Sequence, residues 1–367
     1  MNNIFSNIDA VKHMTAAISR EADPERAYRI MEVCGTHTMS IARYGIASLL
    51  PANISLVSGP GCPVCVTSQA DIDNSIDLAY GAARKLDSGA VQITTFGDML
   101  RVTGSDGRSL YNAKAERNNV HIIYSPLDTL SLAKDNPDKH YVFMAVGFET
   151  TTPMAAGLVH TAAQQGISNI SVLSMCKTMP AAFDLLLADP NAKIDGFLCP
   201  GNVSIITGSS IYEPIVAAKK AAAIVGFEPM DILSGVLEII RQINKNDYHV
   251  ANTYTRAASS DGNKKAQALT NKIFEPCDAR WRGLGWLKGS GMAIRYEYMD
   301  YDAISLYNLN TRREEQPTQC RCGDILRGYI APSACPLFGK ACTPMTAVGP
   351  CMVSSEGACA AYYKYRI

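Results

Sequence analysis

The chain has 367 residues, which is long for a single hydrophobic core, so we expect two or three domains. Its 34 basic and 34 acidic residues cancel, which removes the electrostatic argument for a nucleic-acid or anionic-membrane partner. No apolar stretch approaches the roughly 18 to 20 residues that span a bilayer, and the N-terminus lacks the basic and apolar regions of a signal peptide. We therefore expect a cytoplasmic protein whose twelve cysteines serve metal binding or redox chemistry rather than disulfides.

Short apolar runs alternate with helical stretches from about residue 28 to residue 230, and this alternation predicts parallel α/β sheets. Eight runs are predicted strands: 28–33, 54–59, 91–96, 121–126, 141–147, 170–175, 194–201 and 222–229. A helix predicted after the second run has one apolar face, made of Ile72, Ile76, Ala79 and Ala83. The runs divide four and four near residue 130.

We expect three domains from this pattern. Residues 25–130 and 131–240 form two Rossmann-like α/β units, and residues 241–367, joined by an N-terminal helix within 1–24, form a smaller cysteine-rich unit. In open parallel sheets, ligands bind beyond the carboxyl ends of the strands. The unusual motifs of this chain all follow predicted strands, so they meet in one cleft if the two α/β units face each other.

The C-terminal region contains six cysteines and no histidine: Cys320, Cys322, Cys335, Cys342, Cys351 and Cys359. Thiols without imidazoles favour a soft-ligand site, either an iron-sulfur cluster or an all-cysteine zinc site. Structural zinc sites usually use two close C-x2-4-C pairs, which are absent from this region, so the long and uneven spacings favour the cluster. Buried cysteines without a metal are the remaining alternative.

Cys34 ends the first run and precedes a predicted helix. The partial positive charge of a helix N-terminus lowers the pKa of a thiol, so Cys34 is a candidate nucleophile or metal ligand. His37 is then a candidate second ligand or base. A small buried cysteine beside a capping histidine explains the same pattern.

Cys62 and Cys65 form a C-x-x-C pair in a loop that Gly61 and Pro63 should make tight and exposed. Beside a βαβ pattern, this spacing is typical of a redox dithiol. Half of a zinc site and a plain structural loop are the alternatives.

Glu149 follows a strand that we expect to be buried, and three threonines after it open a helix. A carboxylate beside hydroxyl and N–H groups can move protons or hold a small anion, and it can equally pair with a cation. Asp98, with Arg101 as its expected neighbour, allows the same two interpretations. The remaining cysteines are expected in the core: Cys176, Cys199 and Cys277.

Taken together, these motifs resemble the HypD family of nickel-iron hydrogenase maturation proteins. The matching stretches follow the family's order over nearly the whole chain: CGTHT, GPGCPVC, FGDMLRV, SPLD, GFETTTP, GFEPMDIL and MVSSEGACAAYYKY. The most specific match is the family's C-x14-C-x6-C-x16-C pattern, formed here by Cys320, Cys335, Cys342 and Cys359. Cys322 and Cys351 lie outside this pattern.

The resemblance implies two Rossmann-like domains that face a cleft and a third domain whose four pattern cysteines hold a 4Fe-4S cluster. It also implies a scaffold that, with a HypC-type small chaperone, transiently binds iron and assembles its cyanide and carbon monoxide ligands. A HypE-type protein would deliver the cyanide. Cys34 would hold the iron together with a cysteine of the chaperone, with His37 close by, while Cys62 and Cys65 would pass electrons between the cleft and the cluster.

Two positions depart from the family's motifs: Asn202 replaces the usual histidine of PGHVS, and Thr103 replaces the proline of RVPGS. An asparagine donates hydrogen bonds but relays no proton. Our interpretation is a redox-active assembly scaffold rather than a conventional turnover enzyme. The alternative is a stand-alone iron-sulfur and dithiol oxidoreductase that acts on a diffusible substrate.

Overall fold

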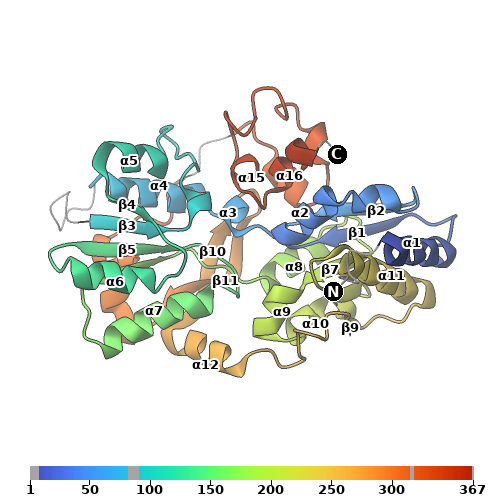
Figure 1. Ribbon diagram of the computed structural model, residues 1–367, viewed down its shortest axis with the longest axis horizontal. Coiled ribbons are helices and arrows are strands. Elements are labelled where there is room, and N and C mark those ends of the chain that lie inside the picture. The colour runs from blue at the N-terminus through green and yellow to red at the C-terminus, as the bar shows by residue number, and fades with distance from the viewer. Residues whose placement is uncertain (1–7, 82–90, 315–317, 366–367) are drawn as a thin grey trace.

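Two parallel β-sheets organise the chain in this computed structural model, which describes residues 8–81, 91–314 and 318–365 (Figure 1). The first sheet has five parallel strands, in the order β2 (Ile54–Ser58), β1 (Tyr28–Glu32), β7 (Gly196–Pro200), β8 (Ala221–Val225) and β9 (Val250–Asn252). Every residue of β7 and β8 is buried. This burial explains their unbroken apolar sequences, because both faces of a parallel sheet are usually covered.

The second sheet has four parallel strands, in the order β4 (Val120–Ile122), β3 (Val91–Thr95), β5 (His140–Ala145) and β6 (Ile170–Ser174). Its central strand β3 is buried throughout, and five of the six residues of β5 are buried. Each of the eight predicted runs therefore overlaps one strand of a parallel sheet. The short strand β9 was not expected.

The expected division of the strands near residue 130 is wrong. β1 and β2 pair in the sheet of β7 and β8, whereas β3 and β4 pair with β5 and β6. The chain therefore crosses from the first sheet to the second after β2 and returns after β6. Residues 25–130 and 131–240 each contribute to both sheets, so neither range is a separate sheet unit.

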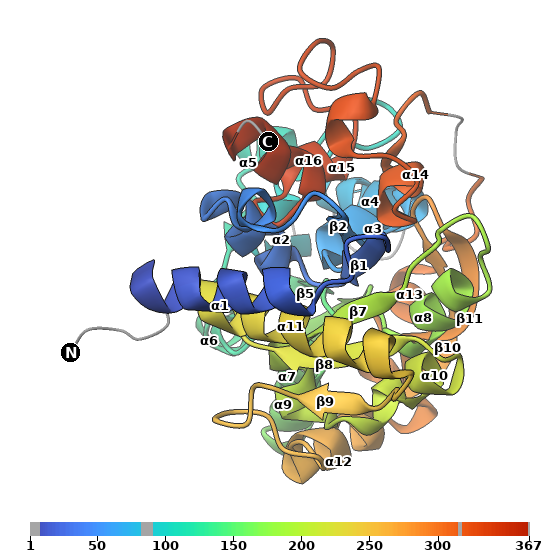
Figure 2. The same cartoon turned by 90° about the vertical axis from the view of Figure 1, so that its right-hand side faces the viewer.

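The N-terminal helix α1 (Ile8–Glu21) packs against α11 (Pro229–Lys245), and Figure 2 shows the two helices side by side. Ile18 of α1 is buried in the core that these helices share with the first sheet. Pro229 opens α11, where Glu228 and Asp231 form reciprocal capping hydrogen bonds. The expected association of the N-terminal helix with the cysteine-rich unit is therefore wrong.

Other helices cover the two sheets or connect their strands. Ile72, Ile76 and Ala79 form the buried face of one of them as predicted, whereas Ala83 lies outside the described residues. Their bounds are α2 (Gly35–Arg43), η2 (Ile46–Leu49), α3 (Pro63–Val66), α4 (Gln69–Ala79), η3 (Gly97–Met99), α5 (Leu110–Arg117), α6 (Asp128–Asp135), α7 (Thr152–Gln164), α8 (Pro180–Leu187), α9 (Gly201–Thr207), η4 (Ser210–Tyr212), α10 (Glu213–Ala217) and α12 (Lys264–Ile273).

The antiparallel hairpin of β10 (Phe274–Trp281) and β11 (Gly285–Ile294) lies between the two sheets (Figure 1). After it come η5 (Tyr296–Tyr301), α13 (Ala303–Tyr307), α14 (Cys322–Leu326), η6 (Pro332–Ala334), α15 (Pro350–Val353) and α16 (Ala358–Tyr365). α15 packs against α3, and α16 packs against α2. The cysteine-rich segment, residues 318–365, therefore covers the helices that follow the CGTHT and GPGC motifs.

The hydrophobic helices of this fold are short. Within the described part of the chain, no helix is both long and apolar enough to cross a membrane.

Candidate functional site

The carboxyl ends of the two sheets meet at a cavity of about 180 Å³, which we call the central cavity. The motifs that follow β1, β2, β5 and β7 supply most of its walls, and one side chain of the cysteine-rich segment reaches it. The polar and proline residues among its lining are Cys34, Thr36, Pro63, Thr150, Thr151, Pro200, Asn202 and Glu356. Four of the five strand-end motifs therefore converge as the sequence predicts, whereas the FGDMLR stretch after β3 does not line this cavity.

Cys34 is the N-cap residue of α2, and its thiol faces the amide oxygen of Asn202 at 4.0 Å. Burial raises the pKa of the Cys34 thiol to about 12, although the N–H groups of His37 and Thr36 favour the thiolate. The expected lowering of this pKa by the helix N-terminus is therefore wrong, because loss of water outweighs the helix N–H groups. A metal that binds Cys34 must displace the thiol proton.

Glu32 lies at the end of β1, directly before this cysteine, and only 2% of it is exposed. It accepts hydrogen bonds from the backbone N–H of Cys34 at 3.1 Å and from Thr38 Oγ1 at 2.5 Å. Burial raises the pKa of Glu32 to about 8. Sequence reasoning missed this residue, although an acidic residue in the apolar run YRIMEV was a usable signal.

His37 is completely buried on α2 and contacts the loop after β8. Its Nε2 atom lies 3.0 Å from the carbonyl oxygen of Gly226, and its ring packs on Phe227 with 5.0 Å between centroids. Burial lowers the pKa of His37 to about 4, so the imidazole is neutral at pH 7. With Nε2 donating to Gly226, Nδ1 carries the free lone pair, and it has no hydrogen-bond partner among the described residues.

Glu356 brings the cysteine-rich segment to the central cavity. Its Oε1 atom accepts a hydrogen bond from Thr36 Oγ1 at 2.8 Å. A Cβ atom added to Gly35 would lie 2.5 Å from the Cβ atom of Glu356, so this approach requires glycine. Sequence reasoning did not single out Glu356, although it lies within the SSEGAC stretch of the family-like ending.

Glu149 lies after β5 but does not line the central cavity. Its Oε1 atom accepts a hydrogen bond from the backbone N–H of Met179 at 2.8 Å, and its buried Oε2 atom has no partner among the described residues. Burial raises the pKa of Glu149 to about 7. A role in proton transfer or anion binding remains a prediction for this residue.

Asp98 contacts the cysteine-rich segment rather than its expected neighbour. Its Oδ2 atom accepts hydrogen bonds from Ser355 at 3.1 Å and from Ser354 at 3.4 Å. Arg101 lies over the ring of Tyr111, 6.0 Å from the ring centroid. The sequence position of Asp98 after β3 therefore serves to attach the cysteine-rich segment to the second sheet.

Cys62 and Cys65 are buried, with exposures of 4% and 1%, so the expected exposed turn is wrong. Cys62 is the N-cap residue of α3, where its Sγ atom accepts a hydrogen bond from the N–H of Cys65 at 3.3 Å. The Cys62 thiol also donates to Ser354 Oγ at 3.4 Å. Burial raises the pKa of Cys65, and contacts with the thiols of Cys351 and Cys62 add to this effect.

Cys351 connects the C-x-x-C pair to the cysteine-rich segment. Its thiol interacts with Cys65 on one side and with Cys322 on the other, and these two contacts lower the pKa of Cys351. Cys322 in turn contacts Cys320. These five thiols form a continuous row, which we call the thiol row, ordered Cys62, Cys65, Cys351, Cys322 and Cys320. Cys322 and Cys351 had no expected role.

The four cysteines of the C-x14-C-x6-C-x16-C pattern line one small cavity, together with Cys322 and Cys351. Burial raises the pKa of Cys359, and the charges of the neighbouring cysteines add to this effect. All twelve cysteines of the chain are free thiols in this structure. Among the described residues, no three His, Cys, Asp or Glu side chains are placed to hold a single metal ion.

The three cysteines expected in the core divide into two groups. Cys176 and Cys199 are buried, whereas Cys277 is partly exposed and lines a cavity beside Lys177.

Comparison with known proteins decides the family. A family model described as "HypD: Hydrogenase formation hypA family" matches residues 9–366. The chain belongs to the HypD family. It is 45% identical to the hydrogenase maturation factor HypD of Azotobacter vinelandii over 98% of this chain and 95% of that protein. It is 40% identical to HypD of Cupriavidus necator, over 98% of this chain and 96% of that protein, and 40% identical to a putative hydrogenase expression/formation protein of Methanocaldococcus jannaschii, over 97% of each. As a HypD family member, this chain is a hydrogenase maturation factor.

Proposed function

We propose that this HypD family chain is the scaffold on which iron receives cyanide and carbon monoxide ligands for a nickel-iron active site. A HypC-type chaperone and a HypE-type cyanide donor are its proposed partners. The observation that carries this proposal is the continuity from the central cavity to the cysteine pattern: one thiol faces the cavity, and the thiol row leads from the neighbouring C-x-x-C pair to Cys320.

Iron is the cargo of this site, and Cys34 is its proposed ligand, with a cysteine of the chaperone as the second. Soft thiolates suit low-spin iron that carries strong-field ligands. Once the Cys34 proton is displaced, the N–H groups of Thr36 and His37 stabilise the resulting thiolate. Asn202 adds a polar group at the same cavity, but it cannot relay a proton.

The proposed cyanide step is a reductive cleavage. The C–S bond between cyanide and the donor's sulfur breaks, and an iron–carbon bond forms. Cys62 and Cys65 supply two electrons and two protons as they form a disulfide. With these two electrons, the donor's sulfur is released as a thiolate and the carbon as cyanide. One proton converts the thiolate to the donor's thiol, and the other proton is released to solvent. The burial of Cys62 and Cys65 keeps the dithiol away from bulk water and from dissolved oxidants.

Cys320, Cys335, Cys342 and Cys359 would hold a 4Fe-4S cluster. These residues fit that group, because the four thiols line one small cavity and thiols are the donors that iron-sulfur clusters use. When bound, the cluster supplies single electrons at low potential. Cys322 and Cys351 line this cavity, and Cys351 also contacts Cys65, so their thiols offer a sequence of contacts along which the dithiol can be restored.

The alternative proposal is a stand-alone oxidoreductase that uses the same dithiol on a diffusible substrate. Its distinguishing property is independence from partners, because such an enzyme turns over alone. The burial of Cys62 and Cys65 favours the scaffold, since a diffusible substrate needs direct access to the reacting thiol.

An infrared spectrum with iron analysis tests the proposal. The full chain is co-expressed with its candidate small chaperone and purified without oxygen. We expect bands of metal-bound cyanide and carbon monoxide that disappear in Cys34→Ala, while the absorbance of the cluster remains. Cys199→Ala is the matched control, because Cys199 is also buried, on β7, but does not line the central cavity. Identical bands in the parent and in Cys34→Ala would exclude Cys34 as the iron ligand.

A further inference from the structure

A basic hollow of about 630 Å³ opens beside the cysteine-rich segment, and we call it the arginine hollow. The loop after β3, the β10–β11 hairpin and the segment around Cys320 form its walls. Three arginines line it, and it reaches two thiols of the thiol row: Arg280, Arg282, Arg321, Cys320 and Cys322. Among the described lining residues, Asp324 is the one acid. Because the whole chain has no net charge, this excess of positive charge is a local feature.

Arg282 lines the hollow with a guanidinium group that is incompletely hydrogen-bonded. Its Nη1 atom is buried and has no hydrogen-bond partner among the described residues. Guanidinium groups form strong paired hydrogen bonds with carboxylates, so the three arginines that line the hollow suit the acidic side chains of a partner.

Exposed apolar side chains lie on a loop and on the hairpin that form walls of the hollow. Val348 lines it with 40% of its surface exposed, and Met345 on the same loop is 87% exposed. Trp286 pairs with Arg280 across the hairpin and is 47% exposed, with Arg312 over its ring at 5.8 Å. Methionine, tryptophan and arginine are enriched in protein interfaces. A small anion would leave these side chains uncovered, so they favour a protein partner.

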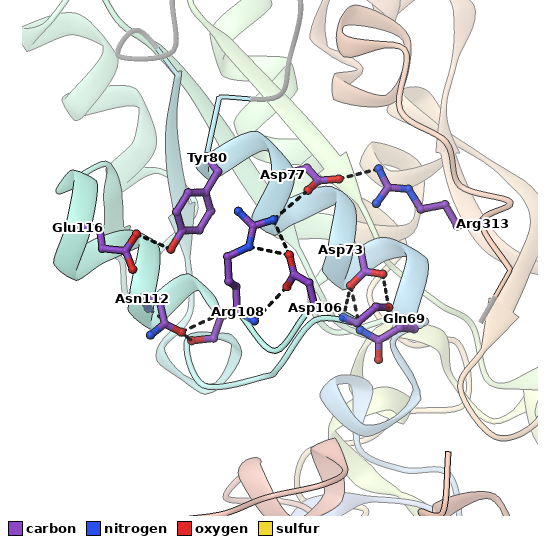
Figure 3. A network of polar contacts seen from close by, with 11 residues as sticks. Gln69, Asp73, Asp77, Tyr80, Asp106, Arg108, Asn112, Glu116 and Arg313 are labelled. Atoms are coloured by element: carbon purple, nitrogen blue, oxygen red, sulfur yellow. Dashed lines mark hydrogen bonds and ion pairs between the residues drawn. The ribbon is translucent and has the colours of Figure 1, made fainter. Parts of the chain in front are cut away.

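The wall formed by the loop after β3 is held in place by the polar network in Figure 3. Asp73 of α4 accepts hydrogen bonds from the N–H of Ser105 at 2.8 Å and from its Oγ at 2.6 Å. Gln69 donates to the same carboxylate at 3.0 Å. Nearby, Arg313 binds Asp77 of the same helix at 2.6 Å. These contacts make the hollow a preformed surface, which reduces the ordering that a partner must impose.

We propose that an acidic one-electron carrier protein docks on the arginine hollow and delivers electrons beside Cys320 and Cys322, at the end of the thiol row opposite Cys62. This inference rests on the proposed function, because each cyanide transfer consumes the two electrons of one dithiol. Two one-electron deliveries, with two protons from solvent, convert the Cys62–Cys65 disulfide back to two thiols. The hollow and the central cavity then lie at opposite ends of one path.

The test measures how fast the cluster-loaded full chain, bound to its small chaperone, is reduced by two reductants of different charge. Reduced plant-type [2Fe-2S] ferredoxin is the acidic protein probe, and photoreduced 5-deazariboflavin is the neutral one. Cluster bleaching gives the rate, and thiol counting gives the yield. We expect Arg321→Gln and Arg282→Gln to lower the ferredoxin rate about tenfold at low salt and less at high salt. The deazariboflavin rate should not change.

Arg241→Gln is the matched control. The side chains of Arg241 and Arg321 are 42% and 48% exposed, and each pairs with one carboxylate, but Arg241 lies on α11 beside α1. Ferredoxin should reduce the cluster of the Arg241→Gln variant at the parental rate. Because Arg321 is adjacent to the cysteines, rates are compared at equal cluster content, and Arg280→Gln repeats the test from β10.

The outcomes separate this proposal from the proposed function. Ferredoxin rates that stay at the parental value in all three hollow variants would overturn the docking site and leave the scaffold untouched. An equal fall in the deazariboflavin rate would also overturn it, because the arginines would then affect reduction itself rather than the docking of an acidic protein. If neither reductant generates thiols in the parent, the electron path itself is absent and the proposed function fails.

Discussion

The Sγ atom of Cys62 lies 3.4 Å from the Oγ atom of Ser354, a residue 292 positions later in the chain. Ser354 also approaches the carboxylate of Asp98, which follows β3 of the second sheet. A motif of the first sheet, a loop of the second sheet and the cysteine-rich segment therefore meet at one buried hydroxyl group. This meeting point is where the C-x-x-C pair is closed off from solvent.

Ser354→Ala removes this hydroxyl group, and we expect it to lower the free energy of unfolding by about 1 kcal/mol, the usual value of a hydrogen bond. Urea unfolding of the reduced protein measures the change. Ser355→Ala is the matched control, because Ser355 is exposed and its side chain donates a hydrogen bond to the same carboxylate of Asp98. Its effect should stay below about 0.5 kcal/mol. Ser354 Oγ also accepts a hydrogen bond from the N–H of Glu356, so equal losses in the two variants would mean that the contacts with Cys62 and Glu356 together contribute nothing to stability.

Gly35→Ala should be strongly destabilising. The new methyl group would lie 2.5 Å from the Cβ atom and 2.7 Å from the carbonyl oxygen of Glu356, so either α2 or the cysteine-rich segment must shift. We expect a loss of about 1 to 3 kcal/mol in the free energy of unfolding, as for other overpacked sites. Gly157→Ala, within α7, is the contrasting variant, because its methyl group meets only Leu269 Cδ2 at 4.0 Å.

The higher helix propensity of alanine should make Gly157→Ala neutral or stabilising by about 0.5 to 1 kcal/mol. The pair therefore separates the close approach at Gly35 from a general cost of replacing glycine. If Gly35→Ala proves as stable as the parent in urea unfolding, Glu356 does not press on α2 in solution.

Cys335→Ser and Cys351→Ser should have different consequences. The first removes a residue of the four-cysteine pattern, so we expect loss of cluster absorbance and of the iron bound in the cluster. The second interrupts the thiol row between Cys65 and Cys322, so the cluster should remain while reduction of the Cys62–Cys65 disulfide becomes much slower. Iron analysis and thiol counting after reduction of the cluster measure the two effects. Loss of the cluster in Cys351→Ser would make Cys351 a ligand instead.

Glu149 should make the protein less stable as the pH rises from about 4.5 to about 7. Burial raises the pKa of this carboxyl from 4.5 to about 7, so the folded state keeps a proton that the unfolded state releases in this interval. The contribution of Glu149 to the free energy of unfolding is fully present below pH 4.5. It declines until about pH 7, by on the order of a few kcal/mol.

Glu149→Gln removes this titration, so the difference in unfolding free energy between parent and variant should change across the same interval. Urea unfolding at several pH values measures it. Glu297→Gln, at an exposed position, is the control and should follow the parent at every pH. Parallel curves for Glu149→Gln and the parent would contradict the raised pKa.

Local sequence patterns predicted the strands but not their partners. The runs that became β1 and β3 are both short and rich in apolar or β-branched residues, so nothing within them indicates that β1 pairs with β7 and β3 with β5. Pairing depends on where the chain crosses between sheets, and that crossing is decided by packing of distant segments. The same limit explains α1, whose apolar face is visible in the sequence although its partner α11 is not.

The site was predictable where a single motif carries it and unpredictable where two distant segments meet. Cys34, Cys62 and Cys65 were recognised from their own surroundings. The burial of Cys62 and Cys65, and the position of Cys351 between them and Cys322, depend on a segment almost 300 positions away. The raised pKa of Cys34 follows from that covering as well, since burial is its main cause.

The double crossing of the chain also bears on how the protein is made. During synthesis, β1 and β2 emerge first, but β1 lacks its second neighbour until β7 has been produced. The second sheet, by contrast, is contiguous from β3 to β6 and can form in the interval. Pairing between segments this far apart is slow, and an unpaired apolar strand edge invites aggregation. We therefore expect the nascent chain to depend on chaperones that shield β1 until the first sheet closes.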